Sequence, residues 1–187
     1  MADAAQIDAP VDAAQFASGT YGFEEQVNPG PTIPYMFANG ALMTLPNPNP
    51  GGSSGVILVD CNGNDGAFGF GCTDSMQFIP EGKKFFAYSS ISPTEVLEFQ
   101  FPAALSAFSL AISNTNVSEN TTYVVTGFNS ANAVVATANI NSTTFANWIN
   151  NRVNLANVNG FNRVQIKKSV IANGVIAIDD MRWTVMP

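Results

Sequence analysis

Apolar and polar residues alternate along several short segments in the second half of the chain. Val96–Phe101 and Phe108–Ile112 each carry apolar side chains at every second position. Because successive side chains of a strand point to opposite faces, this period of two predicts strands with one buried face. Tyr123–Phe128 and Val134–Ile140 flank the turn-forming residues 129–132. This arrangement predicts a β-hairpin.

Glycine and proline separate the other apolar segments, which are shorter. Further strands are expected at Tyr21–Glu25, Ala41–Leu45, Val56–Val59, Met76–Ile79, Phe85–Tyr88, Phe161–Lys167 and Val175–Val185. Residues 46–52 form a proline-rich loop that cannot join a ladder. One short helix is expected at Thr143–Asn151, with Ser142 or Thr143 as its cap. Roughly ten to twelve short strands in one chain predict an all-β fold, a single antiparallel β-sandwich of the jelly-roll type.

The domain organisation follows from the start of the strand signals. The chain has 187 residues, which suits one domain, and we assign the sandwich to residues 20–187. Residues 1–19 form an N-terminal arm without a strong apolar face, in which Asp3, Asp8 and Asp12 are spaced along the sequence. The arm is either a flexible tail or a segment that a neighbouring subunit orders, which would make it a route to self-association.

The charge pattern limits the partners of this protein. Charged residues make up 11% of the chain, against roughly 25% in typical soluble domains, and the net charge is −7. Without a basic stripe we expect no nucleic-acid binding and no attraction to anionic membranes. No apolar run is long enough to span a bilayer, so we expect no membrane insertion.

The two cysteines indicate the redox state of the compartment in which the protein resides. Cys61 and Cys72 are separated by a glycine-rich segment that can close easily. We favour a disulfide, which would stabilise by about 3 kcal/mol, over two free buried thiols. A disulfide implies an oxidising compartment. Because the N-terminus has no signal-peptide pattern, we expect one of two routes out of the cell. Either a leader was removed, as in an extracellular or cell-surface protein, or the protein is released by lysis, as a virion protein is.

Several segments of the sequence are similar to segments of known bacterial domains. They are residues 22–44, Phe101–Phe108, Gly127–Val135 and Val175–Trp183. In this order they resemble secreted β-sandwich domains, which include carbohydrate-binding-module-like jelly rolls and the ectodomains of PEP-CTERM surface proteins. The resemblance covers about residues 20–187. The sorting tail of the PEP-CTERM group would begin where the chain stops, at Met186–Pro187.

This resemblance implies a structural calcium ion. The first and last strands of such jelly rolls often pair, which would bring Glu24 and Glu25 close to Asp179 and Asp180. Carboxylates held close together repel unless a cation is present, and calcium accepts such oxygen ligands. Adjacent strand residues face opposite sides, so we prefer Glu24 and Asp180 as ligands. The alternative is that all four acids are solvated at strand ends.

Aromatic residues in loop-like segments are candidates for ligand binding. A sugar ring can stack its apolar face on an exposed aromatic ring. We select Tyr35, Phe68, Phe70 and Trp148, of which Phe68 and Phe70 lie in a glycine-rich loop. The alternative is that these rings anchor the core or the loops.

The absence of histidine from the sequence argues against an enzyme. It excludes serine–histidine and cysteine–histidine catalysis, and no acidic residue lies in a recognisable catalytic motif. We therefore expect a non-catalytic extracellular binding module stabilised by calcium, with a glycan or cell-surface polymer as partner. A structural subunit of a surface assembly, filament or virion is the alternative. A glycan-active enzyme, which needs two carboxylates in one cleft, ranks third.

Overall fold

The described part of the chain is built from strands. The computed structural model describes residues 18–21, 34–37, 40–46, 55–60, 84–89, 96–114, 121–142, 152–169 and 175–187. Its strands are β1 (Gly19–Tyr21), β2 (Tyr35–Met36), β3 (Leu42–Thr44), β4 (Gly55–Asp60), β5 (Lys84–Ser89), β6 (Val96–Asn114), β7 (Thr121–Phe128), β8 (Val134–Ser142), β9 (Arg152–Lys168) and β10 (Val175–Val185). The predicted all-β fold is confirmed. Within these ranges no helix is long and apolar enough to cross a membrane.

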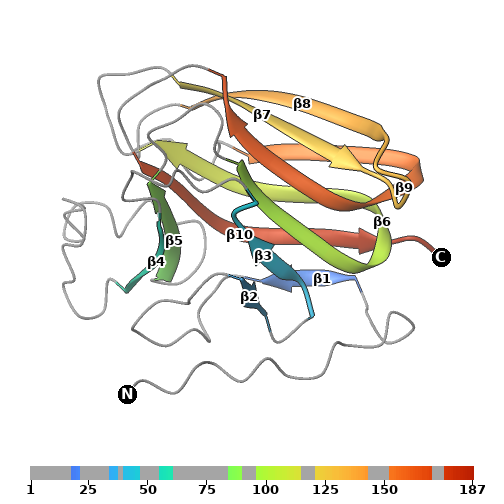
Figure 1. Cartoon of the computed structure of the whole chain (residues 1–187), viewed down its shortest axis with the longest axis horizontal. Helices are drawn as coiled ribbons and strands as arrows, with labels where there is room; N and C mark the ends of the chain where they lie inside the picture. Colours follow the sequence, from blue (N-terminus) through green and yellow to red (C-terminus); the bar gives the residue numbers. More distant parts are fainter. Residues whose placement is uncertain are drawn as a thin grey trace.

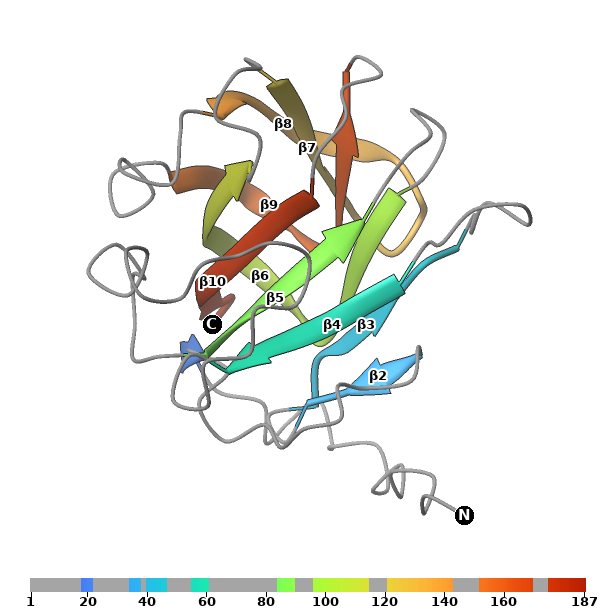
Figure 2. The same ribbon diagram turned by 90° about the vertical axis from the view of Figure 1, so that its left-hand side faces the viewer.

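Two long strands, β6 and β9, fold the sheet over on itself (Figures 1 and 2). The first layer contains β2, β3, β7 and β8, together with residues 96–101 of β6 and 161–168 of β9. The second layer contains β1, β4, β5 and β10, together with residues 105–114 of β6 and 152–156 of β9. All of these pairings are antiparallel, so the architecture is the predicted antiparallel β-sandwich.

The corners of the long strands differ from the sequence-based prediction. Separate strands were expected at Val96–Phe101 and Phe108–Ile112, whereas the structure joins them in β6 with register shifts at the corner. Pro102 lies in this corner, where the missing N–H is tolerated because the ladder is already interrupted. Strand β9 also begins earlier than predicted, at Arg152 instead of Phe161. In both cases the corner breaks the period of two, although the hydrogen-bonded strand continues.

Some predicted elements lie outside the described residues. These are the strand at Met76–Ile79, the helix at Thr143–Asn151 and residues 1–17 of the predicted arm 1–19, of which Gly19 is the first residue of β1. The first strand was predicted at Tyr21–Glu25, whereas β1 spans Gly19–Tyr21 and residues 22–25 lie outside the described ones. This strand does pair with β10, with Gly19 opposite Trp183 and Tyr21 opposite Met181.

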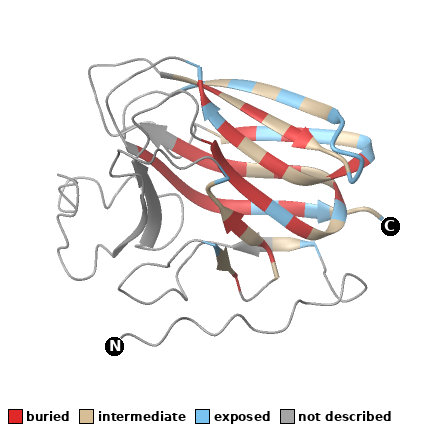
Figure 3. Ribbon diagram, in the orientation of Figure 1, coloured by how far each residue is buried: buried red, intermediate tan, exposed pale blue. Residues whose placement is uncertain are grey.

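Buried residues lie along strands of both layers (Figure 3), and their side chains form one hydrophobic cluster. Its largest fully buried side chains are Tyr123, Phe37, Phe99, Phe108 and Phe161. The rings of Phe99 and Phe108, which lie on opposite sides of the β6 corner, have centroids 6.3 Å apart. Truncating one such ring to alanine costs about 3–5 kcal/mol, so these contacts hold the layers together.

Candidate functional site

The outer surface of the first layer carries polar side chains on neighbouring strands. Leu97 and Phe99 of β6 are buried in the core, so the alternate residues of this strand project away from it. We call this surface the polar face. Two rungs of cross-strand neighbours define it: Glu98, Gln165 and Thr126, followed by Gln100, Arg163 and Phe128.

Glu98 lies at the centre of the polar face and is almost completely covered. Glu98 is only 4% exposed to solvent. Its Oε1 accepts a hydrogen bond from Gln100 Nε2 at 2.7 Å. Its Oε2 accepts hydrogen bonds from Gln165 Nε2 at 2.6 Å and Arg163 Nη1 at 2.9 Å. A buried carboxylate is tolerated when it is paired and hydrogen-bonded in this way.

These contacts determine the protonation of Glu98. Burial by itself raises the pKa of this carboxyl group. The hydrogen bonds from Gln165, Gln100 and Arg163 and the positive charge of Arg163 act in the opposite direction, and together they lower the pKa below its ordinary value. Glu98 is therefore a stable anion at neutral pH, and it holds three donor side chains in fixed positions.

Arg163 links this network to the turn between β7 and β8. Its guanidinium carbon lies 4.2 Å from the centroid of the Phe128 ring, within the range of a cation–π contact. Its Nη2 donates to Asn132 Oδ1 at 3.1 Å. Asn132 has a φ of 61°, which asparagine adopts more readily than most residues. Asn129 stabilises the same turn, because its Oδ1 accepts from the backbone N–H groups of Ala131 and Ala133.

A cavity of about 340 Å³ opens above Glu98. Its other lining residues are Gln100, Phe101, Asn129, Ser130, Asn132, Asn162 and Arg163. Amide, hydroxyl and guanidinium groups dominate this lining, which suits a ligand with many hydroxyl groups. Glu98 is the single carboxylate among the described residues that line it. Among the described residues, its lining thus holds one carboxylate, whereas glycoside hydrolysis uses a pair.

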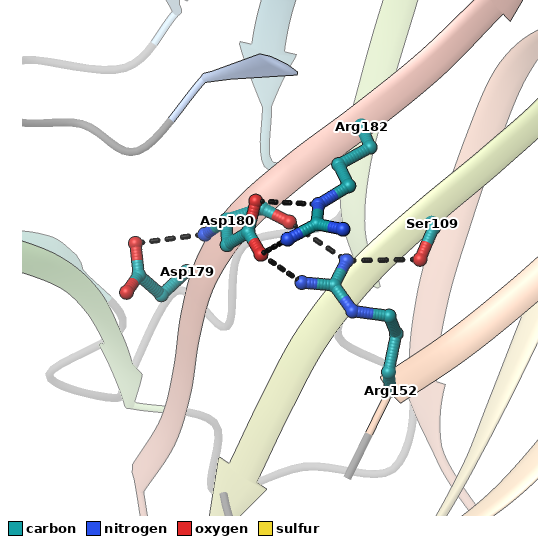
Figure 4. A network of polar contacts seen from close by, with 5 residues as sticks. All are labelled: Ser109, Arg152, Asp179, Asp180 and Arg182. Carbon is teal, nitrogen blue, oxygen red and sulfur yellow. Dashed lines mark hydrogen bonds and ion pairs between the residues drawn. The ribbon is translucent and has the colours of Figure 1, made fainter. Parts of the chain in front are cut away.

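The predicted acidic residues of the last strand, Asp179 and Asp180, lie in β10 on the second layer. Figure 4 shows the polar contacts around them. The ladder between β10 and β6 shifts between Asp179 and Arg182, which forms a β-bulge. Asp180 occupies the bulge with a φ of 46°, a conformation that aspartate tolerates better than most residues. Its backbone N–H donates to Asp179 Oδ1 at 2.7 Å.

Two arginines neutralise Asp180. Its Oδ1 accepts from Arg182 Nε at 2.9 Å, and its Oδ2 accepts from Arg182 Nη2 and from Arg152 Nη2. Arg152 also donates to the Asp180 carbonyl and to Ser109 Oγ, each at 2.9 Å. Burial lowers the pKa of Arg152, while the negative charge of Asp180 opposes this shift. The arrangement fixes the bulge by connecting β6, β9 and β10.

Calcium binding therefore fits Asp180 poorly, because both of its carboxylate oxygens already accept hydrogen bonds from arginines. Asp179 is fully buried. Glu24 and Glu25, the other predicted ligands, lie outside the described residues. A structural calcium that involves these residues stays a prediction.

Of the other predicted site residues, Tyr35 is described, and it is not among the residues that line the cavity above Glu98. Tyr35 lies in β2 and is half-buried, with its ring edge-on to Phe37 at a centroid distance of 5.0 Å. The remaining predicted residues, which are Phe68, Phe70, Trp148, Cys61 and Cys72, lie outside the described residues. Their roles in ligand binding and in a disulfide stay predictions.

The residues of the polar face were not selected from the sequence. Glu98 points away from the core, as the period of two of its strand predicts, but it is buried. A usable signal exists in Glu98-Phe99-Gln100 and Arg163-Val164-Gln165, where polar side chains with complementary hydrogen-bonding groups alternate with apolar ones. Only the pairing of β6 with β9 shows that the two triplets lie side by side.

Comparison with known proteins places this architecture among solved β-sandwich structures. No protein-family model matches the chain, and no curated protein matches it. The K2 cleaved adhesin domain of Lys-gingipain has 11% sequence identity and a TM-score of 0.57, over 90% of this chain and 100% of that domain. The two proteins share the fold.

Carbohydrate-binding modules also align over most of the chain. TmCBM61, solved in complex with β-1,4-galactotriose, has 13% identity and a TM-score of 0.47, over 88% of this chain and 94% of its own. The C-terminal family 22 module of Clostridium thermocellum Xyn10B has 12% identity and a TM-score of 0.46, over 92% and 96% of the two chains.

Proposed function

We propose that this protein is a non-catalytic glycan-binding module and that the polar face is its binding site. The observation that carries this proposal is the buried Glu98 carboxylate, which fixes the amides of Gln100 and Gln165 and the guanidinium of Arg163 beside an open polar cavity. Donors and acceptors that are held in advance lose little conformational entropy when they bind a ligand. Hydroxyl groups, which both donate and accept, match this lining.

The chemistry of the cavity also favours binding over catalysis. Glu98 is held as an anion by three donors and is therefore a poor general acid at neutral pH. We further propose an extracellular or cell-surface location, where glycan polymers are accessible. The resemblance to secreted bacterial domains supports this location, as does the low content of charged residues.

A glycan array, followed by calorimetric titration of each glycan that binds, tests the proposal. Asn132→Gly keeps the positive φ of the turn but removes the Oδ1 that accepts from Arg163. We expect it to weaken binding about two- to tenfold, the effect of losing one hydrogen bond. Asn154→Ala, on the outer side of the second layer and exposed, is the matched control and should bind as the wild type does.

Two results would contradict this proposal. One is a folded wild-type protein that binds no glycan on an array containing plant, microbial and animal polysaccharides. The other is a glycan whose affinity falls equally in Asn132→Gly and Asn154→Ala, because that would place the binding site away from the polar face.

A further inference from the structure

A second cavity, of about 430 Å³, opens on the same outer surface as the Glu98 cavity. We call it the lysine cavity. It is lined by Val124, Thr126, Gln165, Lys167, Lys168 and Ser169. No acidic residue occurs in this described lining. Gln165 joins the two cavities, because it lines the second while its Nε2 donates to Glu98 beside the first.

Strand β9 sets the spacing between the two cavities. The register places Lys167 opposite Val96 of β6 and Val124 of β7, which is one rung beyond Gln165. Alternate strand residues project from the same face, about 7 Å apart, so Lys167 lies about 13 Å along the strand from Arg163. Lys167 is exposed, and it forms no ion pair with another residue of the described ranges. Its ammonium group is available to a ligand.

The charge of this surface differs from that of the whole protein. The chain carries 7 basic and 14 acidic side chains. Two of the basic ones, Arg163 and Lys167, project from this outer surface of β9, whereas the neighbouring Lys168 is buried. The opposing Glu98 is already paired with Arg163 at 2.9 Å. A protein of net charge −7 repels an anionic polymer in general, so an anionic group is accommodated best where positive side chains are concentrated.

We propose that the glycan is acidic and that it occupies both cavities. Its hydroxyl groups bind in the cavity above Glu98, and a carboxylate or sulfate group on the same chain binds to Lys167 in the lysine cavity. The inference rests on the proposed function, because it specifies the class of glycan that the polar face recognises. Uronic-acid and sulfated polysaccharides share the required chemistry, which is a hydroxyl-rich ring bearing a fixed negative charge.

Matched pairs of polysaccharides test the inference. De-esterified homogalacturonan and its methyl-esterified form differ in the charge of their carboxyl groups, and heparin and N-desulfated heparin differ in their sulfate content. Binding is measured by titration calorimetry at low and high salt. We expect the more anionic member of at least one pair to bind at least about fivefold more tightly at low salt, and the difference to shrink as salt screens the charges.

Lys167→Gln removes the proposed contact without changing a buried residue. It should weaken binding of the anionic member about two- to fivefold, as expected for an exposed ion pair, and leave the neutral member unaffected. Arg182→Gln is the charge-matched control, because its side chain is 57% exposed on the second layer and Asp180 keeps Arg152 as a partner; its melting temperature verifies that it is folded. It should bind as the wild type does.

The outcomes separate this inference from the proposed function. If neutral glycans bind as well as acidic ones, and Lys167→Gln has no effect while Asn132→Gly does, the acidic-glycan inference is wrong and the glycan-binding proposal stands. If no glycan of either kind binds, both are wrong. Preference for the homogalacturonan pair identifies a carboxylate ligand, and preference for the heparin pair identifies a sulfate ligand.

Discussion

At the scale of single residues, arginine side chains pair with two of the described buried carboxylates, those of Glu98 and Asp180. Glu98 is paired with Arg163 on the first layer, and Asp180 is paired with Arg152 and Arg182 on the second. The described residues contain no other pair of this kind. The two networks differ in what surrounds them. Asp180 stabilises a β-bulge, whereas Glu98 organises donors beside a cavity, and this difference is why the polar face is the stronger candidate for function.

The lowered pKa of Glu98 predicts how stability depends on pH. A glutamate in the unfolded chain has a pKa of about 4.3. Because the pKa of Glu98 is lower in the folded protein, ionised Glu98 raises the free energy of unfolding. This contribution is fully present above the unfolded-state pKa and is lost as the pH falls through the folded-state pKa. Glu98→Gln cannot ionise, so its urea midpoint should be lower than that of the wild type at neutral pH and should fall less steeply below about pH 4.

Plotted against pH, the urea midpoints of the wild type and of Glu98→Gln should approach each other in acid, because protonated glutamate and glutamine are nearly isosteric. Parallel curves across the whole range would show that Glu98 does not contribute through its charge. The pH dependence would then have to come from other carboxylates.

At the scale of elements, the corners of β6 and β9 decide the shape of the molecule. They lie next to each other, and the end of the chain covers them, because Met186 N donates to Ala104 O at 2.9 Å. Gly160 occupies the β9 corner with a φ of 74°. A Cβ atom at this position would lie 3.2 Å from Ala104 Cβ and would also collide with Met186 Sδ. The corner therefore requires glycine for both its backbone conformation and its packing.

Gly160→Ala should destabilise the protein by at least about 1–2 kcal/mol, the usual cost of a left-handed conformation for a residue with a Cβ atom. The change is measured by urea unfolding. Asn159→Ala, at the exposed neighbouring position, is the control and should change stability little. Equal stabilities of Gly160→Ala and the wild type would show that the corner can relax without cost.

At the scale of the whole molecule, the first described strand is anchored to the last. Strand β1 pairs with β10, and Ser18 Oγ accepts from Val185 N at 2.8 Å. A variant that begins at Ser18 keeps every residue of this pairing. The expected consequence differs between the two leading functions, because a structural subunit would use the arm for assembly and a binding module would not need it.

We expect the full chain and a variant without residues 1–17 to be monomers in light scattering, with a mass near 19.8 kDa for the full chain. Assembly of the full chain combined with a monomeric truncated variant would favour the alternative of a structural subunit. Unchanged melting temperatures would verify that both forms are folded.

Local patterns allowed much of the fold to be predicted. The hairpin of β7 and β8 and the strands β3, β4, β5 and β10 all agree with the sequence-based expectations. These elements have either a period of two or a short turn, and both properties depend on neighbouring residues. The continuous strands β6 and β9 were not predicted, because their corners interrupt the period without ending the hydrogen bonding.

The sequence by itself determined that the chain is all-β, that it carries net negative charge and that it has no histidine for catalysis, because these properties depend on composition and local periodicity. Only the tertiary structure decided which polar residues form the candidate site. Glu98 and Arg163 are 65 residues apart in sequence. They meet because β6 pairs with β9, and this long-range register depends on how the core packs, which no local pattern of residues encodes.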